Sequence, residues 1–106
     1  MEVERNAVQY LHINLLLAKG SALESEWGEA AESLAAASKY LPGLKRAAHS
    51  SQIVTVTEVA ELTRLVGAAL DTVHSHRFPP EVDDARLITQ RWVTATGGDT
   101  PPGSVE

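Results

Sequence analysis

No cysteine occurs among the 106 residues of this sequence. That absence excludes disulfide bonds, thiolate metal ligands and a cysteine nucleophile together, and it leaves the redox compartment undetermined. The fold must therefore be stabilised by packing rather than by covalent cross-links.

The sequence also lacks a long apolar run. The longest, Ile13–Ala18, is far too short to span a bilayer, and Glu2 and Glu4 do not form the basic start of a signal peptide. We therefore expect a soluble, cytoplasmic protein that makes no membrane contact.

Basic side chains are outnumbered, with 9 Lys and Arg against 14 Asp and Glu, and the net charge is -5. Such a chain binds phosphate backbones poorly unless its basic groups gather on one face. We do not expect nucleic acid as a partner. A glycine-rich phosphate loop, a Gly-x-Ser-x-Gly elbow and a His-Glu-x-x-His motif are also missing from the sequence.

What is present is an ordinary globular composition, with 43% hydrophobic and 22% charged residues, and the length of one domain. Apolar residues recur at helical spacing up to Thr96, and beyond it the chain is rich in glycine and proline. We predict one helical domain over residues 1–96 and a flexible tail over residues 97–106.

The first two predicted helices are joined by a very short connection. Helix one covers Val3–Lys19 and is expected to stop at Gly20, after which Ser21 and Glu24 have the spacing of a capping box. Helix two has an apolar seam with steps of four and three, and Pro42 is expected to end or kink it near Tyr40. The residues of this seam are Leu23, Trp27, Ala30, Leu34, Ala37, Leu41 and Leu44.

The run Ile53–Thr57 is rich in β-branched residues and by itself favours a strand. Because no partner strand exists elsewhere, and because Thr55 and Glu58 have capping-box spacing, we predict instead a third helix reaching about His74. Pro80 suits the first turn of a fourth helix. Its predicted apolar face consists of Val82, Ala85, Ile88, Trp92 and Ala95. These elements predict an all-α, single-domain four-helix bundle built from antiparallel helical hairpins.

Charged residues follow a regular order along these helices, with acidic residues at the starts and basic residues at the ends. This order complements the helix dipole, so the glutamates near the start of helix two are interpreted as a solvated face rather than a metal cluster. His74 and His76 are interpreted in the same way, because a His-x-His pair on a helix directs its rings apart. His49 could add a third nitrogen, but nothing requires it. We predict no metal site and no cofactor.

The segment Arg5–His12 resembles the spacing of an arginine, six residues and a histidine in the HEPN family, whose helical dimeric members include metal-independent ribonucleases. The resemblance implies that Arg5 and His12 are a catalytic pair, with Asn6 as the polar residue after the arginine. A spacing of seven places both side chains on one face of a helix, as two groups acting on one phosphate require.

The main prediction is a non-enzymatic module for protein–protein interaction or assembly, such as an adaptor, structural subunit, inhibitor or chaperone. Helix one is apolar on more than one side, and a small bundle cannot bury all of that surface internally. The predicted interface residues are Tyr10, Leu16, Leu17 and Trp92. We expect a homo-oligomer, although a different protein partner is the open alternative. A third interpretation is a nucleic-acid-binding regulator that uses Lys39, Lys45 and Arg46.

Overall fold

The structure is a computed structural model that describes residues 2–96, with side chains from Arg5 onward. The described residues form helices and no strand. The helices are α1 (Glu2–Leu23), α2 (Trp27–Ser38), α3 (Leu41–Ala48), α4 (Val56–His74) and α5 (Glu81–Thr96). The predicted tail, residues 97–106, lies outside the described residues.

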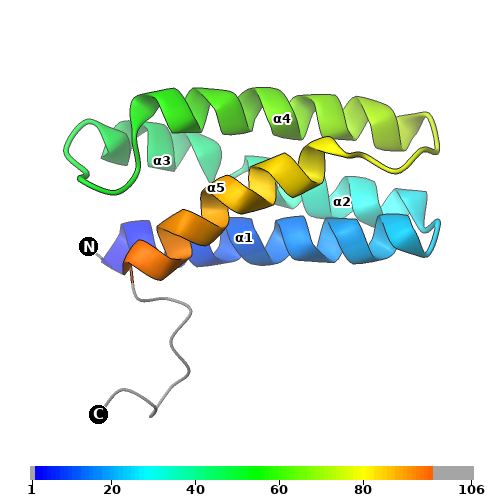
Figure 1. The fold of residues 1–106 in the computed structure, drawn as a ribbon, viewed down its shortest axis with the longest axis horizontal. Helices are drawn as coiled ribbons and strands as arrows, with labels where there is room; N and C mark the ends of the chain where they lie inside the picture. The colour runs from blue at the N-terminus through cyan, green and yellow to red at the C-terminus, as the bar shows by residue number, and fades with distance from the viewer. Residues whose placement is uncertain (1, 97–106) are drawn as a thin grey trace, which may run out of the picture.

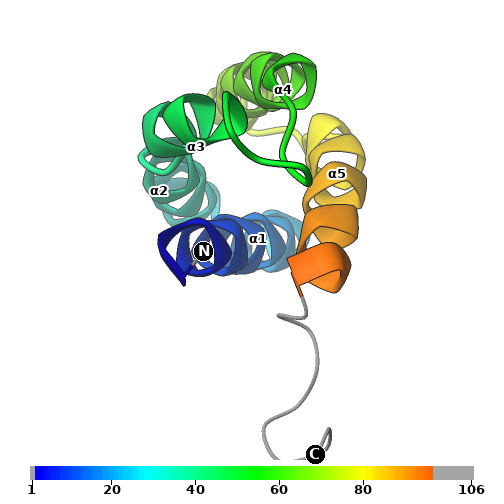
Figure 2. The same ribbon diagram turned by 90° about the vertical axis from the view of Figure 1, so that its left-hand side faces the viewer.

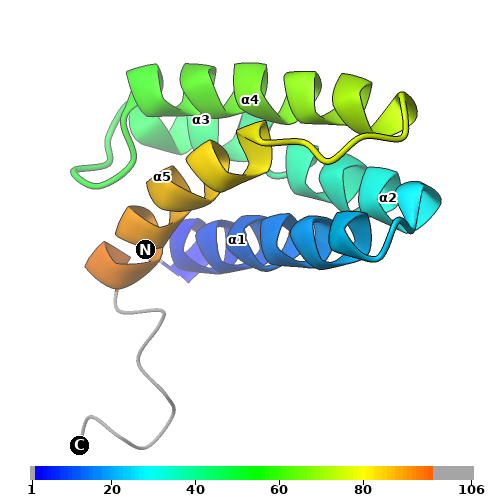
Figure 3. The same ribbon diagram turned by 45° about the vertical axis from the view of Figure 1, so that its right-hand side comes forward.

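The helices form a four-sided bundle around one apolar core (Figures 1 and 2). One side is α1, the next is shared by α2 and α3, and the others are α4 and α5. Consecutive sides run in opposite directions, and α5 crosses the bundle obliquely (Figure 3). The predicted all-α bundle of antiparallel hairpins is confirmed, with the second helix divided into two pieces. No described helix combines the length and the apolar character that a membrane crossing needs.

The turn between α1 and α2 differs from the prediction. The expected stop at Gly20 is wrong, because α1 continues through this glycine to Leu23. The chain turns instead at Ser25, which has a φ of 60°. The amide of Glu26 donates to the carbonyl of Ser21 over 2.8 Å, and the amide of Ser25 donates to that of Ala22 over 3.0 Å. These two bonds form a Schellman motif, which closes the end of a helix with one left-handed residue.

The division between α2 and α3 is where the sequence places it. α2 ends at Ser38, and α3 begins at Leu41 with Pro42 in its first turn, so the predicted break near Tyr40 is confirmed. A proline in a first turn costs no helical hydrogen bond, because the amide that it lacks has no partner inside the helix.

The start of α4 also follows its local sequence. Thr55 is the N-cap residue in an extended conformation, and its Oγ1 accepts from the amide of Glu58 over 3.1 Å. Upstream, the hydroxyl oxygen of Ser51 accepts from the amides of Ile53 and Val54, each over 3.0 Å. These bonds satisfy the backbone of the segment without a partner strand, so the prediction of a helix start here is correct.

Candidate functional site

α1 carries two apolar seams on different sides, each with steps of three and four residues. The inner seam is buried in the core and consists of Val8, Leu11, Leu15, Ala18 and Ala22. The outer seam points to solvent and consists of Tyr10, Ile13, Leu17 and Gly20. Since α1 is on one side of the bundle with no other helix over its outward surface, this second seam is open (Figure 2). Steps of three and four are the spacing by which one helix packs against another.

Two leucines widen the outer seam, and the whole surface is named the α1 face. Leu16 is 42% exposed and Leu23 is 65% exposed, compared with 51% for Tyr10 and 55% for Leu17. Leu16 and Leu17, like Tyr10, were predicted from the sequence, whereas Ile13 and Leu23 were missed. The spacing from Tyr10 to Gly20 is the signal that could have identified Ile13.

The α1 face carries no charge. Between Tyr10 and Leu23 the only Asp, Glu, Lys or Arg is Lys19, and its Nζ lies 2.8 Å from Oδ1 of Asp83 on α5. Asn14 directs its side-chain amide to the carbonyl oxygen of Tyr10 over 2.8 Å. A solvent-facing helix side of several turns without a charged group is unusual for a monomeric surface and is typical of an interaction site.

Tyr10 is held in place at one end of the α1 face. Its ring stacks on that of Tyr40, between α2 and α3, with centroids 5.9 Å apart and planes inclined by 27°. A rigid, half-exposed tyrosine provides contact area at a low cost in side-chain entropy.

Trp92 is not part of this surface, which corrects its prediction as an interface residue. The side chain is 1% exposed, and its Nε1 donates to Oε1 of Glu58 on α4 over 2.8 Å. This bond joins α5 to α4. Nη2 of Arg91 lies 2.6 Å from Oε2 of Glu58. Burial acts to raise the pKa of Glu58, but the hydrogen bonds from Trp92 and Arg91 outweigh it and hold that pKa below its ordinary value.

Arg5 and His12, the pair suggested by the HEPN resemblance, have different surroundings. Arg5 is exposed, whereas His12 is only 9% exposed, with Nδ1 lying 2.7 Å from Oγ1 of Thr89 on α5. The hydroxyl of Thr89 also donates to the carbonyl oxygen of Arg86, which ties this contact to the backbone of α5. Burial lowers the pKa of His12, the charge of Arg86 lowers it further, and a hydrogen bond with Gln90 opposes both. His12 therefore serves the packing of α1 on α5.

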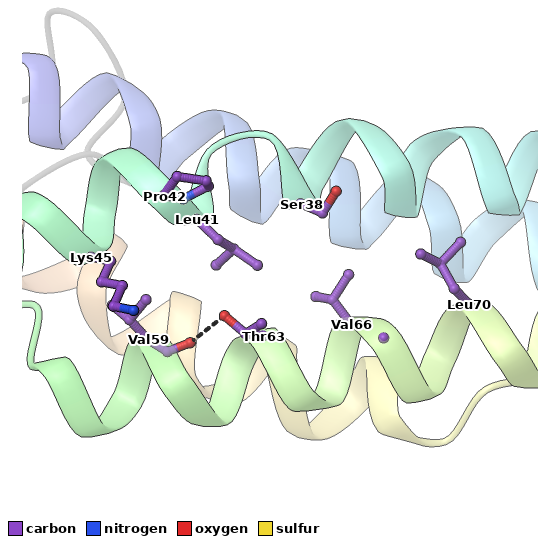
Figure 4. A pocket seen from close by; sticks show the side chains of 9 residues that line it. Ser38, Leu41, Pro42, Lys45, Val59, Thr63, Val66 and Leu70 are labelled. Atoms are coloured by element: carbon purple, nitrogen blue, oxygen red, sulfur yellow. Dashed lines mark hydrogen bonds between the residues drawn. The ribbon is translucent and has the colours of Figure 1, made fainter.

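The three predicted basic residues lie around the ends of α2 and α3. Lys39, Lys45 and Arg46 are all exposed. Of these, Lys45 lines a shallow groove of about 490 Å³ between α3 and α4. Figure 4 shows Lys45 and Val59 at one end of this groove and Leu70 at the other. The lining is mostly apolar and suits a phosphate backbone poorly.

His74 and His76 lie at the C-terminal end of α4. His74 is in the last turn of α4, and His76 has a φ of 59° in a second Schellman motif. The imidazole of His76 stacks on the indole of Trp27, with centroids 5.9 Å apart and planes inclined by 7°. This contact joins the α4–α5 loop to the start of α2. Among the side chains that the structure describes, from Arg5 to Thr96, no three His, Asp or Glu are grouped so that they could hold a metal ion.

Comparison with family models, with curated proteins and with solved structures finds no match to this chain. Of the seven large hydrophobic side chains that the described residues expose, five lie on the α1 face.

Proposed function

We propose that this chain is a non-enzymatic assembly module that binds protein through the α1 face. The observation that carries the proposal is the second apolar seam on α1, exposed on a helix whose other seam is already buried. Exposed apolar area has a free-energy cost of roughly 25 cal/mol per Å² in water, and covering it with another protein recovers that cost.

The shape of the surface favours a helix as the binding element. Three turns of α1 separate Tyr10 from Gly20, a length of about 15 Å at 1.5 Å per residue. A helix–helix contact of this length buries a small surface area compared with most specific protein interfaces. We therefore expect reversible association that depends on concentration.

The test is the solution mass, measured by light scattering on a size-exclusion column over a range of concentrations. If the partner is another copy, the mass rises from 11.4 kDa toward twice that value as the protein is concentrated. Leu17→Asp places a charge in the centre of the α1 face and should weaken association by about 100-fold or more, because the carboxylate would be buried without a partner.

Leu87→Asp is the matched control. Leu87 lies on α5 and is 62% exposed, close to the 55% of Leu17, but it is not part of the α1 face. The same change there should leave the mass unaltered. Equal effects of the two variants, or a wild-type mass that stays at 11.4 kDa at every concentration, would contradict self-association through this face.

A further inference from the structure

We infer that the partner of the α1 face is a second copy of the same α1, packed antiparallel about a two-fold axis with Tyr10 of each copy against Gly20 of the other. This inference rests on the proposed function and adds a partner and a register to it. A symmetric dimer needs a surface that complements itself when it is rotated by a half turn.

The outer seam has this property. When a second α1 is laid antiparallel, with its midpoint level with that of the first, Ile13 of each copy is opposite Leu17 of the other. At both ends of the seam, Tyr10 is then opposite Gly20. Two medium-sized pairs fill the centre and a large residue meets the smallest at each end, which is the alternation that a packed helix interface requires.

A parallel arrangement lacks this complementarity. It would place each residue of the seam opposite its own copy, so that two tyrosines met at one end and two glycines at the other. The tyrosines would hold the helices apart where they meet, and the glycines would leave a gap where the backbones should approach. The antiparallel arrangement avoids both defects.

Charge favours the same direction. Glu24, Glu26 and Glu29 are exposed together at the α1–α2 turn, and repulsion from Glu29 and Glu24 raises the pKa of Glu26. Parallel pairing would bring two such acidic turns to one end of the dimer. Antiparallel pairing places the two acidic turns at opposite ends of the dimer, where they repel each other less.

The pairing can be tested at Gly20 because the monomer leaves room there. A Cβ added to this glycine meets nothing within 4 Å, so a larger side chain is compatible with the fold. Gly20→Leu should weaken the dimer by at least about tenfold, because the leucine would collide with the ring of the opposing Tyr10. The double change Tyr10→Ala with Gly20→Leu exchanges large for small and should restore most of that loss.

The matched control is Gly28→Leu. Gly28 is an exposed glycine in the first turn of α2, and a Cβ there also meets nothing within 4 Å. Gly28→Leu adds the same side chain outside the α1 face. The dissociation constant of the dimer, measured by sedimentation equilibrium, should therefore stay within about twofold of the wild-type value.

The absence of native cysteine gives a second, geometric measurement. A mixture of the single variants Tyr10→Cys and Gly20→Cys, oxidised at dimer-forming concentration, should form mainly the mixed disulfide. The Gly20→Cys protein alone should cross-link poorly, because its two thiols would be roughly 15 Å apart in the antiparallel dimer, well beyond disulfide reach. Mass spectrometry distinguishes the products.

The outcomes separate the two proposals. Efficient cross-linking of Gly20→Cys with itself, or a Gly20→Leu dimer as tight as wild type, would overturn the antiparallel register. In that case, weaker association of Leu17→Asp would still support binding through the α1 face. If Leu17→Asp also has no effect on association, both proposals fail.

Discussion

The imidazole of His12 on α1 and the hydroxyl of Thr89 on α5 form a hydrogen bond of 2.7 Å between two buried side chains. Thr89 also donates its own proton to the carbonyl oxygen of Arg86, so its hydroxyl joins the ring of His12 to the backbone of α5. Arg86 on α5 is paired with Asp83, which also pairs with Lys19 on α1. The contact between these two helices therefore combines apolar packing with a small polar network.

Stability should fall as the pH is lowered below about 7.5, where the histidine of the unfolded chain begins to bind its proton. The folded state holds the pKa of His12 below its usual value of about 6.5, so the unfolded chain binds more protons across this window and unfolding becomes easier as the pH falls. Urea denaturation at several pH values measures this slope. His12→Gln should flatten it. His49→Gln, at an exposed histidine, should not, and equal slopes for all three proteins would refute the role of His12.

Glu58 and Trp92 should be energetically coupled across α4 and α5. Their hydrogen bond of 2.8 Å joins a half-buried carboxylate to a buried indole. A double-mutant cycle with Glu58→Ala and Trp92→Phe, measured by urea denaturation, should give a coupling of about 1.5 to 3 kcal/mol, typical of a hydrogen bond to a charged group. Additive effects of the two changes would show that the bond contributes nothing to stability.

Two left-handed residues at the same end of the bundle should respond differently to glycine. Ser25→Gly relieves a strained φ and should raise the free energy of unfolding by about 1 kcal/mol. His76→Gly relieves a similar φ but removes the stack on Trp27, so its gain should be smaller or negative. The fluorescence of Trp27 should change with His76→Gly and stay the same with Ser25→Gly. An equal gain at both positions would mean that the stack adds no stability.

Gly67→Ala should stabilise the protein by about 1 kcal/mol. Gly67 lies in the interior of α4, is exposed, and has no atom within 4 Å of an added Cβ. We therefore expect alanine to stabilise the helix by the full difference in helix propensity between alanine and glycine. Thermal denaturation measures the gain, and a lower melting temperature would show that the groove beside Gly67 tolerates no added atom.

Much of the fold could be predicted because its signals are local. The N-cap at Thr55, the break before Pro42 and the apolar periods of the helices each depend on residues within one or two turns of chain. At Gly20 the local signal is misleading. A glycine is a common stop signal, but here the Schellman turn at Ser25 closes the helix five residues later.

Composition and spacing alone determined that this chain forms an all-α bundle and that α1 has more apolar surface than one side can bury. Only the tertiary structure decided which surface remains open. The packing of α5 brings Trp92 into contact with Glu58 on α4 and Thr89 into contact with His12, whereas Tyr10, Leu16 and Leu17 on α1 remain exposed. The helical period determines which residues share a face of a helix. The packing of helices that are distant in the sequence determines which of these faces is exposed to solvent.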